Sequence, residues 1–312
     1  MSTHSGELLR RAEEILAKKG KTFHWAKRLL NPKHGDRATR LYAFCRYLDD
    51  LADEASSKER ARAQLMEVSR ALQTGQTSDP VIADALQLMS DCRIEPRIPQ
   101  ELINGLLTDL DEVELKTVDE LLRYCYRVAG TVGLMMSDVL DVTDPAASAF
   151  AIDLGVGMQL TNICRDIKED AQMGRRYLPA EIIGKVTMED LINPSEVQQK
   201  RLRVGVEYLL NLADEYYSSG ESGLPFLPLR ARHGILIAAR VYRAIGVKLR
   251  ERDFNYWEER AVISKGRKVR ITLAGLAGTF IGAKFWRKPL KHRADLHLAL
   301  KGLPRVDSHY GY

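Results

Sequence analysis

Nearly the whole chain repeats its hydrophobic residues with the spacing of an α-helix. Runs of alternating β-branched residues between turns, which are typical of sheets, are missing from the sequence. With 312 residues, 45% of them hydrophobic, the chain can bury one large core. These features predict an all-α protein that folds as a single-domain helical bundle.

One stretch, residues 156–179 (VGMQLTNICRDIKEDAQMGRRYLP), combines an apolar composition with a line of polar side chains. In a helix, Gln159, Asn162, Asp166 and Asp170 stand at i, i+3, i+7 and i+11, which is one continuous stripe. The stripe therefore places carboxylates and amides against an apolar interior. Buried carboxylates need a compensating cation, and oxygen ligands of this kind suit a hard divalent ion such as Mg²⁺.

A second stretch, residues 41–54 (LYAFCRYLDDLADE), repeats this pattern on another apolar helix. Here Tyr42, Arg46, Asp49 and Asp53 stand at i, i+4, i+7 and i+11. A solvated helix face is the ordinary explanation for a single pair of acids at this spacing. Two such pairs can instead face each other across a helical bundle and hold several divalent ions. An arrangement of that kind binds polyphosphates.

These segments resemble the squalene and phytoene synthases, which join two prenyl diphosphates head to head. The resemblance covers about residues 15–270 and implies an all-α bundle of the class I isoprenoid synthase type around a central cavity. Residues 1–270 would form this catalytic domain, and 271–312 a basic C-terminal tail with a short apolar segment. The matching segments are Cys45-Arg46 followed by DDLAD at 49–53, YCYRVAGTVG at 124–133, and QLTNICRDIKED leading into GRRYLP.

The resemblance also implies roles for single residues. The ligands of Mg²⁺ or Mn²⁺ would be Asp49, Asp53, Asn162, Asp166 and Asp170, and the four aspartates would act in catalysis. Tyr124 would be a further catalytic side chain beside the reacting carbons, because an aromatic ring stabilises a carbocation and a hydroxyl can relay a proton. The expected substrate-binding residues are Lys21, Thr22, Tyr42, Arg46, Gln159, Asn162, Arg165, Arg176, Tyr177, Arg260 and Lys268.

Some positions fit the resemblance less closely than others. Gly20 stands where the family has the first serine of a turn that contacts diphosphate, so one hydroxyl contact is missing. In GRRYLP, Arg176 matches the family pattern and Arg175 occupies a variable position. Arg260 and Lys268 have the eight-residue spacing that the family shows, within a region rich in basic residues.

Local signals predict several helix boundaries and contacts. Gly20 should end the first helix, and Thr22 should cap the next one. Thr117, followed by two acids, predicts another helix start. Gly130 and Gly133 in the middle of that helix predict a close approach by another helix or by a ligand.

The start of the chain is charged and lacks the apolar core of a signal peptide, which predicts a cytoplasmic location. The four cysteines are isolated, as expected of small buried side chains in a reducing compartment. The seven histidines show no ligand spacing, so no chemistry is assigned to them.

The tail from Lys265 onward holds eleven Lys and Arg against two Asp, and it contains the uncharged run 271–283. Thirteen residues are too few to span a bilayer, which needs about 20. Peripheral contact with an anionic membrane, on its inner face, and burial of a terminal helix account for this run equally well. Nucleic-acid binding is not expected, because no pattern of aromatic and basic residues typical of a nucleic-acid-binding groove accompanies this charge.

Within the resembled family, the preferred interpretation is a carotenoid-pathway enzyme that converts geranylgeranyl diphosphate into phytoene. NADPH is not expected in that case, since no dinucleotide fingerprint is present. The alternative is a farnesyl diphosphate enzyme that makes presqualene diphosphate, squalene or dehydrosqualene. Head-to-tail prenyl diphosphate synthases repeat an Asp doublet in their second motif, whereas here Ile167 follows Asp166. A noncatalytic scaffold relative is a remote alternative, because all four aspartates are present.

Overall fold

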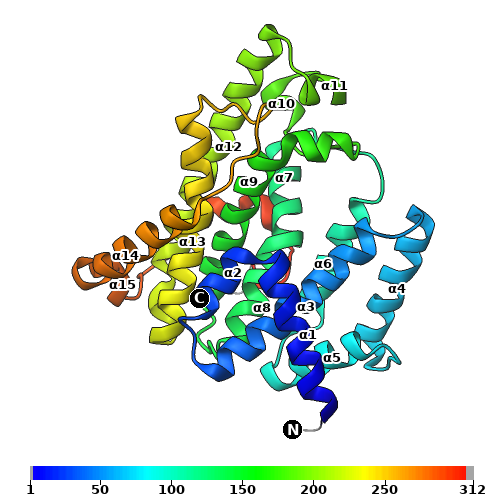
Figure 1. Cartoon of the computed structure of the whole chain (residues 1–312), viewed down its shortest axis with the longest axis vertical. Coiled ribbons are helices and arrows are strands. Elements are labelled where there is room, and N and C mark those ends of the chain that lie inside the picture. The colour runs from blue at the N-terminus through cyan, green and yellow to red at the C-terminus, as the bar shows by residue number, and fades with distance from the viewer. Residues whose placement is uncertain (1–2, 307–312) are drawn as a thin grey trace.

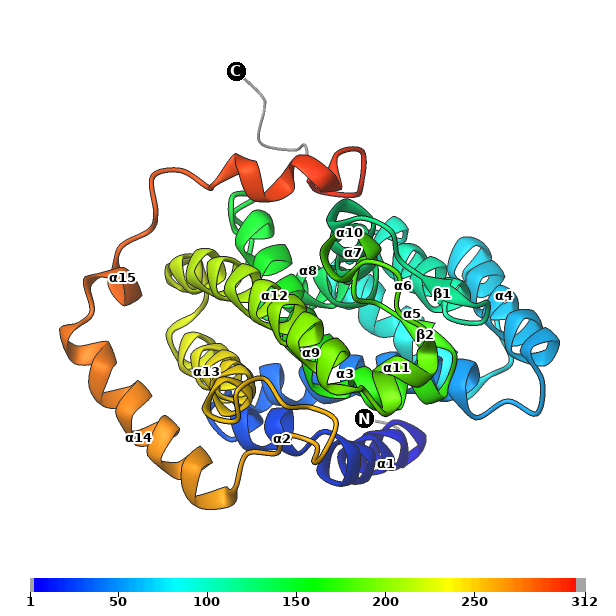
Figure 2. The ribbon, with the colours of Figure 1, turned by 90° about the horizontal axis from the view of Figure 1, so that it is seen from above.

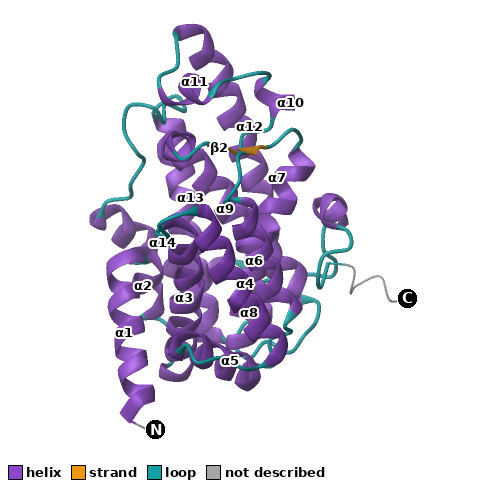
Figure 3. Cartoon of the chain, turned by 90° about the vertical axis from the view of Figure 1, so that its right-hand side faces the viewer, coloured by secondary structure: helices purple, strands orange, loops and turns teal. Residues whose placement is uncertain are grey.

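The computed structural model describes residues 3–306, and they form helices almost throughout, as the periodicity predicted (Figure 3). The first half contains α1 (Thr3–Lys19), α2 (Lys21–Lys27), α3 (Pro32–Asp53), α4 (Lys58–Thr74), α5 (Pro80–Cys92), α6 (Arg97–Thr108), α7 (Val118–Cys125), the π-helical turn η1 (Tyr126–Gly130) and α8 (Thr131–Val139). The second half contains α9 (Ala147–Gln172), α10 (Ala180–Ile183), α11 (Met188–Ile192), α12 (Glu196–Ser222), η2 (Leu224–Phe226), α13 (Leu229–Glu251), α14 (Lys265–Ile281), α15 (Ala283–Trp286) and η3 (Ala294–Leu300). Two short strands, β1 (Val113–Glu114) and β2 (Arg175–Arg176), pair in parallel.

Helix α9 lies in the middle of the bundle (Figures 1 and 2). It packs against α8, η1, α12 and α13, and most of its side chains apart from the polar stripe are buried. This explains why the segment is apolar on nearly every face, as expected of a helix surrounded by others. The second predicted aspartate motif therefore lies on the central element of the fold.

Two glycine positions allow α9 to approach the preceding helices. A Cβ atom added to Gly133 of α8 would lie 2.2 Å from the backbone oxygen of Ala151, and one added to Gly155 would lie 2.3 Å from that of Ala129. No side chain fits at such separations, so glycine is required at both positions. The predicted close approach at Gly133 is confirmed, and the partner is a helix.

The predicted helix start at Thr117 is also confirmed. The Thr117 side chain accepts a hydrogen bond from the Glu120 backbone, and Glu120 reaches back to the Thr117 N–H, which forms a capping box. The predicted cap at Thr22 is wrong. Gly20 alone links α1 to α2, and Thr22 already lies inside α2. Because one residue connects the two helices, no extended position is left that a threonine cap could occupy.

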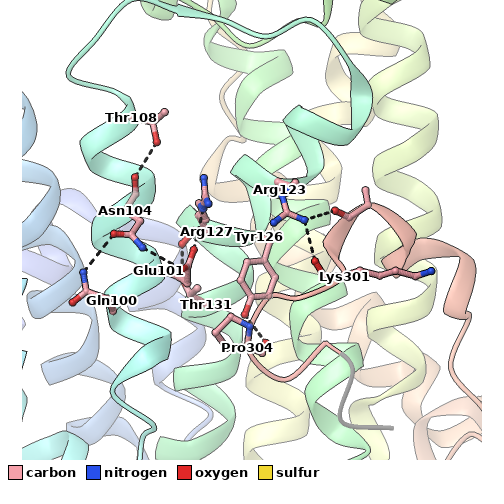
Figure 4. A network of polar contacts seen from close by, with 11 residues as sticks. Gln100, Glu101, Asn104, Thr108, Arg123, Tyr126, Arg127, Thr131, Lys301 and Pro304 are labelled. Carbon is pink, nitrogen blue, oxygen red and sulfur yellow. Dashed lines mark hydrogen bonds and ion pairs between the residues drawn. The ribbon is translucent and has the colours of Figure 1, made fainter. Parts of the chain in front are cut away.

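The C-terminal residues return to the core. The boundary predicted after residue 270 falls inside α14, and Leu296, Leu300, Leu303 and Val306 are buried in the same cluster as side chains of α3 and α9. Figure 4 shows how α7 and η1 hold this segment through its backbone: Arg123 donates to the carbonyls of Ala299 and Lys301, and Tyr126 to that of Pro304. Across residues 3–306, no helix has both the length and the apolar content needed to cross a bilayer.

Candidate active site

A cavity of about 650 Å³ connects the two predicted aspartate motifs to an apolar interior. On α3, Asp49 and Asp53 line it near the end of the helix, and Leu41 lines it further back. On α9, Asp166 and Asp170 take the corresponding place, preceded by apolar and small lining residues. The cavity is therefore acidic at one end and apolar along its length. The remaining lining residues from the predicted set are Tyr42, Arg46, Gln159, Asn162, Arg165 and Arg260.

In the first motif, Asp49 has little cationic compensation. Arg46 makes its ion pair with Asp50, a neighbour of Asp49 that does not line the cavity. Burial, together with the negative charges of Asp53, Asp50 and Asp109, raises the pKa of Asp49 to about 7. A carboxyl group that is held partly protonated in this way gains strongly from an added cation.

The second motif is compensated on one carboxylate only. Burial acts to raise the pKa of Asp166, but Arg165 and Arg260 hold it below its usual value through hydrogen bonds that include those from their Nε atoms at 2.7 and 2.8 Å. One turn later, burial and the charge of Asp166 raise the pKa of Asp170 to about 8. The site thus combines two arginines that are suited to phosphate oxygens with a carboxylate, Asp170, for which residues 3–306 provide no hydrogen-bond or ion-pair partner.

Asn162 supplies an independent sign of a missing ligand. Its side-chain nitrogen donates to Gln159 over 3.4 Å, while its buried side-chain oxygen has no hydrogen-bond partner among the described residues. An unpaired buried oxygen beside carboxylates is costly unless a cation or ligand binds there. The atoms that Asp49, Asn162 and Asp170 offer to a metal ion are all oxygens, so the residues present fit a hard divalent ion such as Mg²⁺.

Asp109, which was not predicted, joins the two motifs through a buried cluster. Its carboxylate accepts hydrogen bonds from the hydroxyls of Tyr124 at 2.9 Å and Tyr177 at 2.6 Å. Burial raises the pKa of Asp109 to about 6, against these two hydrogen bonds. Its charge in turn contributes to the raised pKa values of both Asp49 and Asp170. Tyr124 and Tyr177 stack on each other within this cluster, and neither lines the cavity surface.

The structure assigns the two arginines of GRRYLP to different surroundings. Arg175 donates to Asp53 at 3.1 Å and to the backbone oxygen of Asp109 at 3.1 Å, so it reaches the first motif. Arg176, the residue predicted to bind substrate, is buried on the other side of β2 and pairs with Glu114 at 3.4 Å. Successive side chains of a strand point to opposite faces, which separates the two guanidinium groups.

The remaining predicted substrate-binding residues form a group next to the cavity. Lys268 of α14 donates to the Thr22 hydroxyl over 3.4 Å. Burial lowers the pKa of Lys268, and the nearby charge of Lys21 acts in the same direction. Phe23 leads from this group to Tyr42, with the two ring centroids 6.0 Å apart. Lys21, Thr22 and Lys268 are thus brought together, although they do not line the cavity.

Neither Asp109 nor Arg175 had a usable sequence signal. Asp109 follows α6 in a connection that holds three other acids, so its composition alone marks a polar loop. Arg175 could be preferred to Arg176 only by knowing that the residues pair as a strand with residues 113–114. Strands of two residues show no periodicity.

Comparison with known proteins gives the same family as the motifs. The family model described as squalene/phytoene synthase matches residues 16–267. A 15-cis-phytoene synthase of Enterobacter agglomerans is 37% identical over 81% of this chain and 90% of its own, and a phytoene synthase of Pseudescherichia vulneris is 34% identical over 90% and 94%. A solved structure of a dehydrosqualene synthase in complex with ligand superposes with a TM-score of 0.78 at 28% identity, over 89% of this chain and 98% of that one. The chain belongs to the squalene/phytoene synthase family, and its all-α bundle is the isoprenoid synthase fold of these proteins.

Proposed function

We propose that the protein condenses two molecules of geranylgeranyl diphosphate head to head into phytoene, with release of diphosphate, as a step of carotenoid biosynthesis. The observation that carries the proposal is the cavity, which joins four aspartates and three arginines at one end to a long apolar interior. An anionic headgroup and a hydrocarbon chain on one substrate fit these two parts. The names of the relatives at 37% and 34% identity favour phytoene as the product.

The acidic end would bind both diphosphates. Asp49, Asp53, Asn162, Asp166 and Asp170 would hold Mg²⁺ or Mn²⁺, which when bound neutralises diphosphate and stabilises it as a leaving group. Arg165 and Arg260 now contact Asp166, and they would turn from this carboxylate to phosphate oxygens. Binding by oxygen ligands and guanidinium groups together would then favour ionisation of the allylic substrate.

The apolar lining would protect the carbocation that ionisation creates. The second substrate's double bond attacks this cation, and the new cation loses a proton to close the ring of a cyclopropylcarbinyl diphosphate, which ionises again and rearranges. Lining residues such as Leu41, Val132, Phe150 and Leu154 exclude water, which would otherwise capture the cation. Proton loss would end the sequence without NADPH. The hydroxyls of Tyr124 and Tyr177, held by Asp109, form a buried proton-carrying group beside the motifs.

The proposal is tested by incubating the purified protein with Mg²⁺ and either farnesyl or geranylgeranyl diphosphate, with and without NADPH. The extracted lipid is identified by mass. We expect phytoene from the longer substrate, in the same yield with and without NADPH. A product from farnesyl diphosphate alone would assign the enzyme to the squalene or dehydrosqualene branch. Absence of condensation with both substrates would favour a noncatalytic relative.

We also propose that α14 and α15 contact an anionic membrane surface, which would give the apolar product a place to leave. Figure 2 shows α14 at the outer edge of the molecule. Its outward side presents Val269 and Leu273, and Trp286 and Leu290 follow, all of them exposed. Apolar side chains flanked by exposed basic ones suit an anionic lipid interface. The exposed basic side chains here are Lys265, Arg270, Arg287, Lys288 and Lys291.

Vesicle sedimentation tests the membrane contact. We expect the protein to sediment with vesicles that contain an anionic lipid and to stay in solution with purely zwitterionic ones. Leu273→Glu should weaken the binding, because it places a charge in the apolar patch. The matched change Val204→Glu, at an exposed position of α12, should leave the binding unchanged. Equal binding of Leu273→Glu and the unchanged protein would contradict the proposed surface.

A further inference from the structure

A second cluster of ligand-type side chains lies outside the cavity. Asp153 of α9 accepts hydrogen-bond contacts from the Nε2 atoms of His292 at 2.7 Å and His297 at 2.9 Å. The two histidines belong to the C-terminal segment, 139 and 144 residues further along the chain. No spacing in the sequence predicts this cluster, because the carboxylate that joins the two histidines comes from a distant helix.

Asp153 is unusual because it is a fully buried carboxylate whose recorded partners are both imidazoles. Its relative exposure is 0%, and among the described residues neither Lys nor Arg pairs with it. Burial acts to raise the pKa of Asp153, but the two histidines hold it below its usual value. An ionised carboxylate in the core needs strong compensation, and among the described residues only these two imidazoles contact it.

The three side chains converge on one point. Their candidate ligand atoms lie within 4.8 Å of one another, and the two imidazole centroids are only 4.4 Å apart. Ligand atoms within this range can reach a shared ion about 2 Å from each of them after small side-chain rotations. Two imidazoles and one carboxylate are the ligands that Zn²⁺ accepts, whereas Mg²⁺ prefers oxygen alone.

We propose that Asp153, His292 and His297 form a binding site for a Zn²⁺-type transition metal ion, separate from the Mg²⁺ site of the aspartate motifs. The ion would fasten the C-terminal segment to α9. Exposure of the side chains is low, at 14% for His292 and 6% for His297, so the site is shielded from water but remains within reach of the surface.

The location of the cluster gives such an ion a structural role. The chain between α15 and η3 has no helix of its own, and α7 and η1 bond to the segment after it through its backbone carbonyls (Figure 4). Tyr216 of α12 adds a further bond of this kind, to the Leu296 carbonyl at 2.6 Å. The ring of Phe150 packs edge-on against His292 at 5.2 Å and also lines the cavity. The metal would therefore support the wall of the cavity from behind.

The test measures metal binding directly, in excess Mg²⁺ so that the aspartate motifs are occupied. The full-length protein is dialysed against Zn²⁺ at a buffered micromolar concentration, and bound zinc is determined by mass spectrometry. We expect one zinc ion per chain. When the protein is loaded with Co²⁺ instead, we expect it to show the visible absorption of cobalt bound by nitrogen ligands. His297→Gln and His292→Gln should each lower the zinc affinity at least about tenfold. Loss of a residue that only hydrogen-bonds to a metal ligand already lowers metal affinity by about that factor.

Two controls separate this site from other binding. His233→Gln changes a histidine on α13 outside the cluster, and Asp166→Asn changes the aspartate motif; both variants should keep the bound zinc. Zinc should also raise the melting temperature of the unchanged protein but not that of His297→Gln. Failure of the unchanged protein to bind zinc, or equal binding by His297→Gln, would overturn the proposal and leave a carboxylate held by two hydrogen bonds. Neither result depends on the reaction that the enzyme catalyses.

Discussion

The two aspartate motifs line the same cavity, yet their electrostatic surroundings differ. On α9, Asp166 is neutralised by Arg165 and Arg260, which keep its pKa low. On α3, no arginine among the described residues bonds to Asp49; Arg46 pairs with Asp50 and its charge opposes the effect of burial only in part, so the pKa of Asp49 rises to about 7. Its neighbour Asp53 does pair with Arg175. Each motif of the protein without ligands therefore holds one carboxylate with an arginine partner and one, Asp49 or Asp170, that is left for an added cation. Divalent ions should therefore contribute most at Asp49 and Asp170, and substrate phosphate at the arginines.

The largest effect is expected from removing a carboxylate of either motif. Asp49→Asn and Asp166→Asn should each lower diphosphate release at least about a hundredfold, the scale of losing one preorganised charge-stabilising group. Release is measured by coupled assay of diphosphate. Asp50→Asn is the matched control, since Asp50 adjoins Asp49 but does not line the cavity. This variant should lose clearly less activity than Asp49→Asn. Equal losses for Asp49→Asn and Asp50→Asn would remove the distinction between the two acids.

A smaller effect is expected at the arginines of the second motif. Arg260→Gln should raise KM about ten- to hundredfold, because a charge-assisted contact to phosphate is lost. Arg260→Lys should restore part of the affinity.

The two arginines of GRRYLP can be compared in the same assay. The KM of Arg176→Gln should change less than that of Arg175→Gln, since Arg175 reaches Asp53. The reverse order would support the original sequence-based preference for Arg176.

Asp109 offers a way to alter both motifs at once. Asp109→Asn removes a charge that raises the pKa values of Asp49 and Asp170, and it weakens the support of the Tyr124 and Tyr177 hydroxyls. We expect kcat to fall about tenfold or more, within the range of acid–base contributions, with little change in KM. A variant with unchanged kcat would show that the buried cluster serves the fold only.

The smallest expected effect concerns pH and stability. The raised pKa values of Asp49 and Asp170, about 7 and about 8, favour the folded state most at low pH. That contribution is complete below the ordinary pKa of about 4 and is lost as pH rises through about 7 to 8. Without metal, the melting temperature should therefore fall across this range. Added Mg²⁺ should raise it by about 2 °C or more at pH 8.5, and less at pH 6. A Mg²⁺ effect independent of pH would contradict the assigned titrations.

The parts of the molecule that the sequence predicted are those determined by regular patterns. Helical periodicity indicated the bundle, and the stripes on 41–54 and 156–179 indicated side chains that do meet at one cavity. The capping box at Thr117 and the close approach at Gly133 depend on local chemistry or backbone space, which the residue type reveals.

Other parts depend on tertiary contacts that no short pattern encodes. Arg175 and Arg176 face opposite ways because two residues pair with a strand 62 positions earlier, as the pairing of Val113 with Arg175 shows. Asp109 gains its place from two tyrosines on other segments. The packing of residues 294–306 against α7 was likewise hidden by the high charge of the tail.

The most direct test of the account is a crystal of the protein with Mn²⁺ and an unreactive prenyl diphosphate analogue, with the metal located by its anomalous scattering. We predict manganese at both motifs, bound by Asp49 or Asp53 on α3 and by Asn162, Asp166 or Asp170 on α9, with the diphosphate between them. Arg260 should contact phosphate in that complex. Manganese at one motif alone, or a diphosphate bound away from both, would contradict the claim that the two helices form one site.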